Sequence, residues 1–462
     1  MAKNIVIFSD GTGQRGGVMF DERRSNIYKL YRATRCGPDS SVDPRDQFAF
    51  YDAGIGTVPA GIGFFGAIWQ WIYNIICQAT GLGLTENIID CYVEIIRHWE
   101  PGDRIYLFGF SRGAYTVRCL AAVLSFCGVP TQMSDGRSLL RSEAEIRKIA
   151  YEAVTKVYQH VSSPRDKEFL PQRQAIAARF RMNYGSGAGA NANTYPHFVG
   201  VFDTVAAIAS WGSMAVVLML WITVVVALSL VMWAAVGGFW PWVIFLVGTS
   251  IVVAMALYFK THIKVAFGLA EFRWWRTLHL TDFRMKFYDT QLNINVGWAR
   301  HALAIDEHRK DFDRVPWGTP NDWRKVPNGE PGWFKQEWFA GNHSDIGGSY
   351  SEPESRLSDI SLSWMLNEAV AVPGGLQVDQ SVLKTYPSAS GIQHDETRSF
   401  IFKFTQKINR QIKPNAILHQ SVIDRFNEKT VLHFDELKPY RPEALRLHQA
   451  VCSFYGSPSE PS

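Results

Sequence analysis

Residues 104–118 read RIYLFGFSRGAYTVR, the pattern of a strand, a tight turn and a helix. Residues 104–110 are an apolar run typical of a buried strand, and residues 114–126 are an apolar run typical of a helix. Between them, residues 109–113 match the pattern G-x-S-x-G. A serine on a tight strand-to-helix turn needs small neighbours two positions away on either side. The context therefore predicts a nucleophilic Ser111. The alternative is a helix-capping serine in a nucleotide-binding turn. This turn carries neither a Walker lysine nor a G-x-G-x-x-G pattern, so the sequence does not support nucleotide binding here.

A nucleophile of this kind also needs donors for a developing oxyanion. The backbone N–H of Arg112 lies at the positive end of the following helix and is one candidate. The turn after the first predicted strand, D-G-T-G from Asp10 onward, offers Gly11 or Thr12 as the second. The same turn resembles the D-x-D-G-T pattern of aspartate-nucleophile phosphatases, but Phe8 stands at the nucleophile position.

Strands and helices alternate through most of the chain. This order predicts an α/β protein with an α/β-hydrolase-like, mostly parallel sheet. The expected strands are residues 4–8, 47–51, 104–110, 197–202 and 337–340, and the expected helices are residues 85–99, 114–126 and 298–310.

His343 is the best candidate for the base that activates the serine. It follows the last predicted strand, within the glycine-rich stretch GNHSDIGG at residues 341–348, which we expect to be a loop. The weaker candidates are His197, at the start of a strand, and His301 and His308, on the helix expected at 298–310.

Asp203 is the best candidate for the acid that orients this base. It ends the predicted strand at residues 197–202, and the chain order Ser, Asp, His fits the architecture. Asp345 is the rival, but it lies two residues from His343 on the same loop. We expect Asp345 to support the shape of the loop rather than pair with the imidazole.

Metal chemistry is an alternative use of the same residues. Asp10, Asp203, His343 and Asp345 together could hold a metal ion, as in a metal-dependent phosphoesterase. The six cysteines form no C-x-x-C pair, so we expect free thiols, no zinc site and no cofactor.

Two apolar segments interrupt the chain, and no charged residue occurs between Asp203 and Lys260. Residues 214–236 and 239–259 are each long enough to span roughly 30–35 Å, the thickness of a bilayer core. They predict a transmembrane hairpin at residues 211–260; the alternative is a pair of buried core helices. The flanking parts, residues 1–210 and 261–462, would together form the hydrolase domain.

Basic residues follow the second span, whereas the tip between the spans is uncharged. The positive-inside tendency therefore predicts two spans in the inner membrane, with the catalytic part in the cytoplasm. The start of the chain, MAKNIVIFSD, has too short an apolar run for a signal peptide. Residues 60–76 are also nearly uncharged and could form a lid, an interfacial segment or a buried helix.

The composition narrows the class of protein. The 462 residues carry 47 Lys and Arg against 43 Asp and Glu, a net charge of +4 without a basic tract. This balance gives no support to nucleic-acid binding. Apolar residues make up 47% and aromatic residues 13%, which is incompatible with a disordered chain.

The chain resembles a family of α/β-hydrolases that includes phospholipase effectors of bacterial type VI secretion. The resemblance rests on four stretches, F-x-DGT at residues 8–12, GFSRGAYTVR at 109–118, G-V-x-DTV at 200–205 and HSDxGG at 343–348. Residues 299–312 also resemble the family's helix before the base. The resemblance implies a triad at Ser111, Asp203 and His343, and hydrolysis of lipid esters. The hairpin departs from a secreted effector and favours a resident membrane enzyme.

These observations predict a membrane-anchored serine hydrolase of the lipase or phospholipase class. Its expected partners are the lipid bilayer and a lipid ester, and the sequence names no protein partner. The alternatives are a hydrolase-like membrane scaffold or immunity-like binding protein without turnover, and a metal-dependent phosphoesterase.

Overall fold

A parallel sheet forms the centre of the molecule. The computed structural model describes residues 2–11, 23–54, 82–205, 211–281, 292–312, 315, 317, 332–398 and 406–455. Within these residues, six strands lie in the order β10-β9-β6-β3-β1-β2, and every neighbouring pair is parallel. The strands are β1 (Asn4–Ser9), β2 (Gln47–Asp52), β3 (Arg104–Phe110), β6 (Pro196–Phe202), β9 (Trp298–Ala304) and β10 (Phe334–Phe339).

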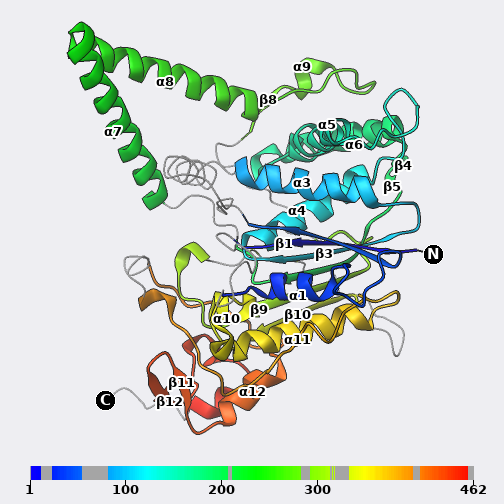
Figure 1. Cartoon of the computed structure of the whole chain (residues 1–462), viewed down its shortest axis with the longest axis vertical. Helices are drawn as coiled ribbons and strands as arrows, with labels where there is room; N and C mark the ends of the chain where they lie inside the picture. Colours follow the sequence, from blue (N-terminus) through cyan, green and yellow to red (C-terminus); the bar gives the residue numbers. More distant parts are fainter. Residues whose placement is uncertain are drawn as a thin grey trace.

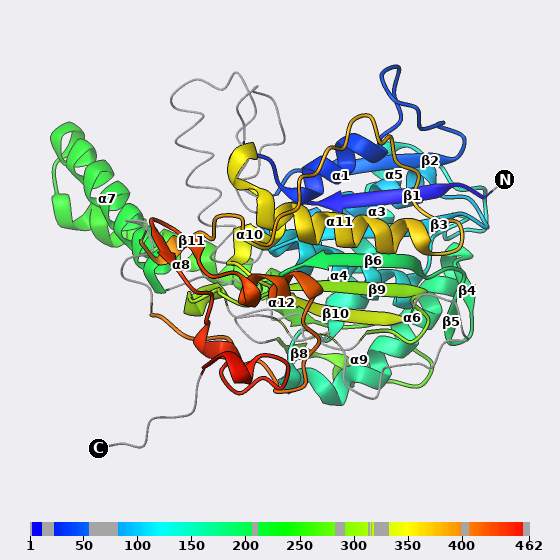
Figure 2. The same ribbon diagram turned by 90° about the horizontal axis from the view of Figure 1, so that it is seen from below.

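Helices cover both faces of this sheet (Figure 1). One face carries α3 (Leu82–His98), α4 (Arg112–Cys127), α5 (Glu143–Glu152) and α6 (Leu170–Tyr184), and the other carries α1 (Asn26–Thr34) and α11 (Arg356–Ala371). Figure 2, viewed from below, shows α1 and α11 running along the direction of the strands. A parallel sheet buried on both faces explains why β1 reads as a continuous apolar run.

The side chains of β1 divide between two hydrophobic cores. Ile5 and Ile7 lie in the core with α3 and α4, whereas Val6 and Phe8 lie in the core with α1 and α11. Successive side chains of a strand point to opposite faces, so one strand supports both layers.

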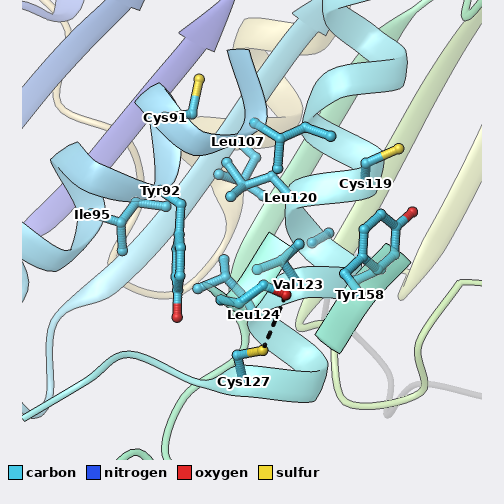
Figure 3. Close-up of a cluster of buried hydrophobic side chains, with 14 of the residues drawn as sticks. Cys91, Tyr92, Ile95, Leu107, Cys119, Leu120, Val123, Leu124, Cys127 and Tyr158 are labelled. Carbon is cyan, nitrogen blue, oxygen red and sulfur yellow. Dashed lines mark hydrogen bonds between the residues drawn. The ribbon is translucent and has the colours of Figure 1, made fainter. Parts of the chain in front are cut away.

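The core beneath α4 fixes this helix on the sheet. Figure 3 shows Tyr92 of α3, Leu107 of β3 and Leu120 and Leu124 of α4, all of them fully buried. Each such side chain contributes roughly 1.5–3 kcal/mol by its removal from water. The helix that follows the predicted nucleophile therefore rests on a rigid support.

Two long helices project away from this body. They are α7 (Trp211–Val236) and α8 (Phe239–His262), which meet at the turn between them and diverge from it (Figure 1). Residues 218–236 and 239–262 have mean hydropathies of 2.4 and 2.2, and only 11% and 0% of these windows are buried. The two helices are long and apolar enough to cross a membrane, and their exposure differs from that of buried core helices.

The chain that follows α8 returns along the body. It forms β7 (Ile263–Lys264) paired with β8 (His279–Leu280), with the short helix α9 (Trp274–Thr277) between them. Another two-stranded ribbon, β4 (Gly187–Ala188) and β5 (Asn191–Ala192), follows α6.

The expectation of a helix at residues 298–310 is wrong. Residues Trp298–Ala304 form β9, which lies between β6 and β10, and only the three-residue turn Lys310–Phe312 is helical. Arg300 and His301 are fully buried and interrupt the apolar pattern of β9, and its three alanines and one leucine favour a helix. Neither periodicity nor propensity therefore indicates a strand here. The strand before His343 begins earlier than expected, at Phe334, and the expected loop contains the short helix α10 (His343–Gly347).

The C-terminal part covers the outer edge of the sheet (Figure 2). It contains α12 (Gln420–Asn427), β11 (Val431–His433) and β12 (Glu436–Lys438). The N–H of Trp338 in β10 donates to the carbonyl of Ile417, and the N–H of His419 donates back to Trp338. The segment before α12 thus occupies backbone groups that an edge strand would otherwise expose.

Candidate active site

Ser111 occupies a strained turn between β3 and α4. Its φ of 57° and ψ of −118° lie outside the regions that side-chain-bearing residues prefer. A Cβ on Gly109 would lie 2.4 Å from the carbonyl oxygen of Gly113, and one on Gly113 would lie 2.0 Å from that of Ser9. Glycine is therefore required on both sides of the serine, as a nucleophile elbow demands.

The side chain of Ser111 makes no capping hydrogen bond to α4. The helix-capping alternative accordingly does not describe this serine. Arg112 is the first residue of α4, and the positive end of the helix dipole lies at this end of the helix.

Asp203 and His343 form a buried pair at the carboxyl ends of the strands. Nδ1 of His343 lies 2.6 Å from Oδ2 of Asp203, although the two residues are 140 positions apart. Asp203 follows β6 with a φ of 35°, and His343 begins α10. The structure therefore brings together the two residues that the sequence analysis selected as acid and base.

Ser111 lies beside this pair. Its N–H donates to the carbonyl of Phe202, the residue before Asp203, over 3.1 Å. The ring of Phe110, the residue before Ser111, stacks on the imidazole of His343, with 4.6 Å between the ring centroids. Nε2 of His343 is buried and has no hydrogen-bond partner among the described residues, so no bond to the Ser111 hydroxyl is formed in this conformation.

Arg410, which no sequence pattern indicated, also binds the acid. Its guanidinium donates to Oδ1 of Asp203 over 2.8 Å and to Oδ2 over 3.0 Å, and the N–H of Ala304 donates to Oδ1 over 3.1 Å. Burial alone would raise the pKa of Asp203, but Arg410 and His343 hold that pKa well below its usual range. The carboxylate is thus ionised. Arg410 belongs to no recognisable motif, so only the fold reveals it.

Glu307 is a second missed residue. Its carboxylate accepts the backbone N–H of His343 over 3.2 Å and pairs with Arg309 over 2.8 Å. Burial opposes the charge of Glu307, but Arg309 more than offsets this and lowers the pKa of the carboxyl. This pair holds the backbone from which the imidazole projects.

Asp345 contacts the base loop rather than the imidazole. It accepts the N–H of Asn342 over 3.0 Å and Nδ1 of His394 over 2.7 Å. Asn342 in turn caps α10 through the N–H groups of Ser344 and Asp345. These contacts fit the supporting role expected for Asp345 and identify His394 as its partner.

Asp10 and Gly11 lie on the other side of the elbow. Asp10 accepts hydrogen bonds from Ser25, from Tyr51 over 2.7 Å and from the N–H of Gly11 over 2.7 Å, and burial raises its pKa to about 6. A Cβ on Gly11 would lie 3.3 Å from Cβ of Ser111, so this turn borders the nucleophile. The N–H of Gly11, one expected oxyanion donor, is already bonded to Asp10.

Two predictions fall outside the described residues. Thr12, the other candidate for the second oxyanion donor, belongs to residues 12–22, and the nearly uncharged segment 60–76 belongs to residues 55–81. Both stay predictions.

The weaker histidine candidates make structural contacts. Nε2 of His197 lies 2.8 Å from the carbonyl oxygen of Pro373, and Nδ1 of His301 lies 3.2 Å from Oε1 of Gln336. Nδ1 of His308 lies 3.3 Å from the carbonyl oxygen of Ile408. Among the residues that the structure describes, no group of three or more His, Cys, Asp or Glu side chains could hold a metal ion.

Comparison with known proteins identifies several similar chains. A yeast protein described as uncharacterized, from Saccharomyces cerevisiae, is 28% identical over 210 residues, which cover 44% of this chain and 26% of that protein. The crystal structure of an uncharacterized protein from Pseudomonas aeruginosa aligns with a TM-score of 0.32 and 16% identity, over 82% of this chain and 47% of that one.

A second solved structure is the Tle1 effector bound to the VgrG spike of the type VI secretion system. It aligns with a TM-score of 0.28 and 16% identity, over 77% of this chain and 52% of that one. The chain thus spans about half the length of these solved proteins and about a quarter of the yeast protein.

The family comparison covers most of the chain. The matching family is described as type VI secretion, phospholipase effector Tle1-like, catalytic domain, and its sequence model aligns with residues 3–233 and 251–368. Ser111, Asp203 and His343 all lie within the aligned residues. The chain belongs to the Tle1-like phospholipase effector family, and the part that matches is the family's catalytic domain.

Proposed function

We propose that this protein is a membrane-anchored serine hydrolase that cleaves carboxylic esters of phospholipids, on an α/β-hydrolase-like fold with an inserted transmembrane hairpin. One observation carries the proposal. The buried Asp203–His343 pair adjoins a strained Ser111 turn at the carboxyl edge of a parallel sheet. Ligands of open parallel sheets bind at this edge.

Ser111 would be the nucleophile and His343 the base. Oγ of Ser111 attacks the ester carbonyl carbon while its proton passes to Nε2 of His343. The tetrahedral intermediate collapses, the proton passes to the leaving alcohol oxygen, and the acyl group stays on Ser111. Water then attacks the acyl-enzyme by the same route, which releases the fatty acid and restores the hydroxyl. Asp203 accepts a hydrogen bond from the Nδ1–H group of His343 and stabilises the imidazolium.

The small turn around Ser111 would leave room for the oxyanion. The backbone N–H of Arg112, at the start of α4, is the proposed first donor, and Thr12 is the proposed second donor because Asp10 already engages the N–H of Gly11. Removal of one such donor typically costs 10²–10³ in rate.

The exposed helices α7 and α8 support a membrane location. Val231, Trp240 and Ile244 are 63%, 70% and 70% exposed in the structure, which is unfavourable for apolar side chains in water. The chain continues from α8 into a surface on which Trp274 and Trp275 are about half exposed, beside Arg273 and Arg276. Tryptophan and basic residues are typical of a membrane interface. We propose two spans in the inner membrane, with the catalytic part in the cytoplasm.

The position of the hairpin favours a lipid substrate. In both ribbon views, α7 and α8 lie on the same side of the molecule as the carboxyl ends of the strands (Figures 1 and 2). A hairpin within the bilayer would hold the Asp203–His343 pair towards the lipid surface. Esters of membrane lipids would therefore be the substrates nearest to Ser111.

A fluorophosphonate probe tests the chemistry independently of the substrate. We expect the full-length protein to be labelled at Ser111, as mapped by peptide mass spectrometry, and Ser111→Ala to lose the label. Ser125→Ala is the matched control, because Ser125 lies on α4 and its hydroxyl only donates to Ala121. Absence of labelling on folded wild-type protein would favour the non-catalytic scaffold.

A further inference from the structure

The Asp203 carboxylate accepts more donors than a simple Asp–His pair supplies. Besides Nδ1 of His343, it receives the backbone N–H of Ala304 and both terminal nitrogens of Arg410. The side chain of Arg410 is 1% exposed and that of Asp203 is fully buried. A forked, buried guanidinium fixes the plane of a carboxylate, which a lysine could not do.

Arg410 is tied to a second part of the site. Its Nη2 also donates to the carbonyl of Phe312 over 2.9 Å. The ring of Phe312 meets the imidazole of His343 edge-on at 5.1 Å. One side chain therefore links the acid to the ring that borders the base.

The charges around His343 nearly cancel. Asp203 at the end of β6 and Glu307 after β9 are the anions that contact its side chain and backbone. Arg410 and Arg309 are the cations paired with those two carboxylates. On α10 itself, the carboxylate of Asp345 is paired with the imidazole of His394. Loss of Arg410 would leave an uncompensated buried anion bonded to the imidazole.

We infer that Arg410 is a positioning residue for the reaction: it orients the Asp203 carboxylate and limits the attraction of that carboxylate for a proton on His343. The inference rests on the proposed function. It concerns a residue beyond the family alignment, which ends at residue 368.

Without the guanidinium, a protonated imidazole would be stabilised by a full carboxylate charge. A cation within about 4–6 Å of a titrating group typically changes its titration by one or more pH units. The rate of Ser111 labelling falls on the acidic side of its pH profile, and this fall should therefore move to higher pH when the charge of Arg410 is removed. If Arg410 had only a structural role, its loss would lower the amount of folded protein and leave the pH of this fall unchanged.

The test uses the full-length protein in bilayer nanodiscs with Arg410→Gln and Arg410→Lys. Gln retains a donor for Asp203 without charge, and Lys retains the charge without the fork. The readout is the ring resonance of His343, assigned by its loss in His343→Gln and followed against pH. We expect an upward shift of the midpoint by about one pH unit in Arg410→Gln, and a midpoint close to that of wild type in Arg410→Lys.

The rate of fluorophosphonate labelling against pH is the second readout. Arg410→Gln should react more slowly below neutral pH and recover at high pH, whereas Arg410→Lys should be slower at every pH. Arg425→Gln is the matched control, because Arg425 is equally buried and bonds to Ala389 and Gly391 rather than to Asp203. It should leave the His343 midpoint in place.

An unchanged His343 midpoint in folded Arg410→Gln would overturn the inference, whether or not Ser111 reacts. If Arg410→Gln does not fold, a large shift of the midpoint in Arg410→Lys would overturn it equally. Absence of wild-type labelling with the resonance shift intact would instead contradict the proposed function and leave the electrostatic role of Arg410 supported.

Discussion

At the scale of single residues, the site depends on how Asp203 is held. Its carboxylate is fully buried and remains ionised because His343 and Arg410 both bind it. Each partner therefore depends on the other two. A change at Asp203 should affect both the chemistry and the stability of the fold.

Asp203→Asn should reduce the rate of Ser111 acylation by about 10⁴-fold, because an amide cannot fix the reactive tautomer of His343. It should also cost about 3–5 kcal/mol in the free energy of unfolding, because Arg410 is left as a buried, unpaired cation. Labelling kinetics and denaturant unfolding measure the two effects. Retention of full reactivity in folded Asp203→Asn would exclude Asp203 as the acid.

Asp52 is a second residue whose protonation the fold controls. Burial raises its pKa to about 7, although hydrogen bonds from Ser9 and Asn87 act in the opposite direction. Because the folded-state pKa is raised, the protonated carboxyl favours the folded state at low pH. This contribution decreases as the pH rises from about 4 through 7, and the total change is roughly 4 kcal/mol at most.

Asp52→Asn should remove this pH dependence. The difference in unfolding free energy between variant and wild type should become more favourable to the variant as the pH rises from 4 to 8. Denaturant unfolding at several pH values tests it. A difference that stays constant over this range would show that Asp52 does not titrate as the structure indicates.

At the scale of elements, the β3–α4 turn requires close contact between α4 and β1. A Cβ on Gly113 would lie 2.0 Å from the carbonyl oxygen of Ser9, and backbone cannot yield as a side chain can. Gly113→Ala should therefore cost at least about 3 kcal/mol of unfolding free energy and displace Ser111.

Gly332→Ala is the matched control for this substitution, because a Cβ there would meet only the Lys335 side chain at 3.7 Å. Thermal unfolding and Ser111 labelling should separate the two variants. Equal behaviour of Gly113→Ala and Gly332→Ala would contradict the elbow geometry.

The membrane location proposed for α7 and α8 can be tested by a charged substitution. An arginine in the middle of α7 would cost about 2.5–3.5 kcal/mol of membrane insertion. Leu228→Arg should accordingly shift the protein out of the carbonate-resistant membrane fraction. Leu447→Arg, at an exposed position in the C-terminal part, should leave it there. Equal recovery of both variants in the membrane would contradict insertion of α7.

At the scale of the whole molecule, the site is assembled from distant parts of the chain. Ser111 follows β3, Asp203 follows β6, His343 begins α10 and Arg410 precedes α12. Because parallel strands end at one edge of the sheet, the first three residues lie in the same region. The C-terminal part then covers the outer strand and supplies the fourth.

This assembly explains what the sequence could predict. Ser111, Asp203 and His343 each follow or adjoin a strand with a clear local pattern, so their meeting at one edge follows from a parallel sheet. The strand β9 could not be recognised, because its alanines favour a helix and the buried Arg300 and His301 interrupt its apolar pattern. Arg410 could not be predicted either, because it lies 207 residues from Asp203 and only tertiary packing joins them.

Product analysis of phospholipid bilayers measures the proposed hydrolysis itself. Purified wild-type protein and Ser111→Ala are incubated with phospholipid vesicles, and the lipids are analysed by mass spectrometry. We expect wild-type protein to release free fatty acid together with the matching lysolipid, and Ser111→Ala to release neither. Equal release by both proteins, or none from folded wild-type protein, would contradict it.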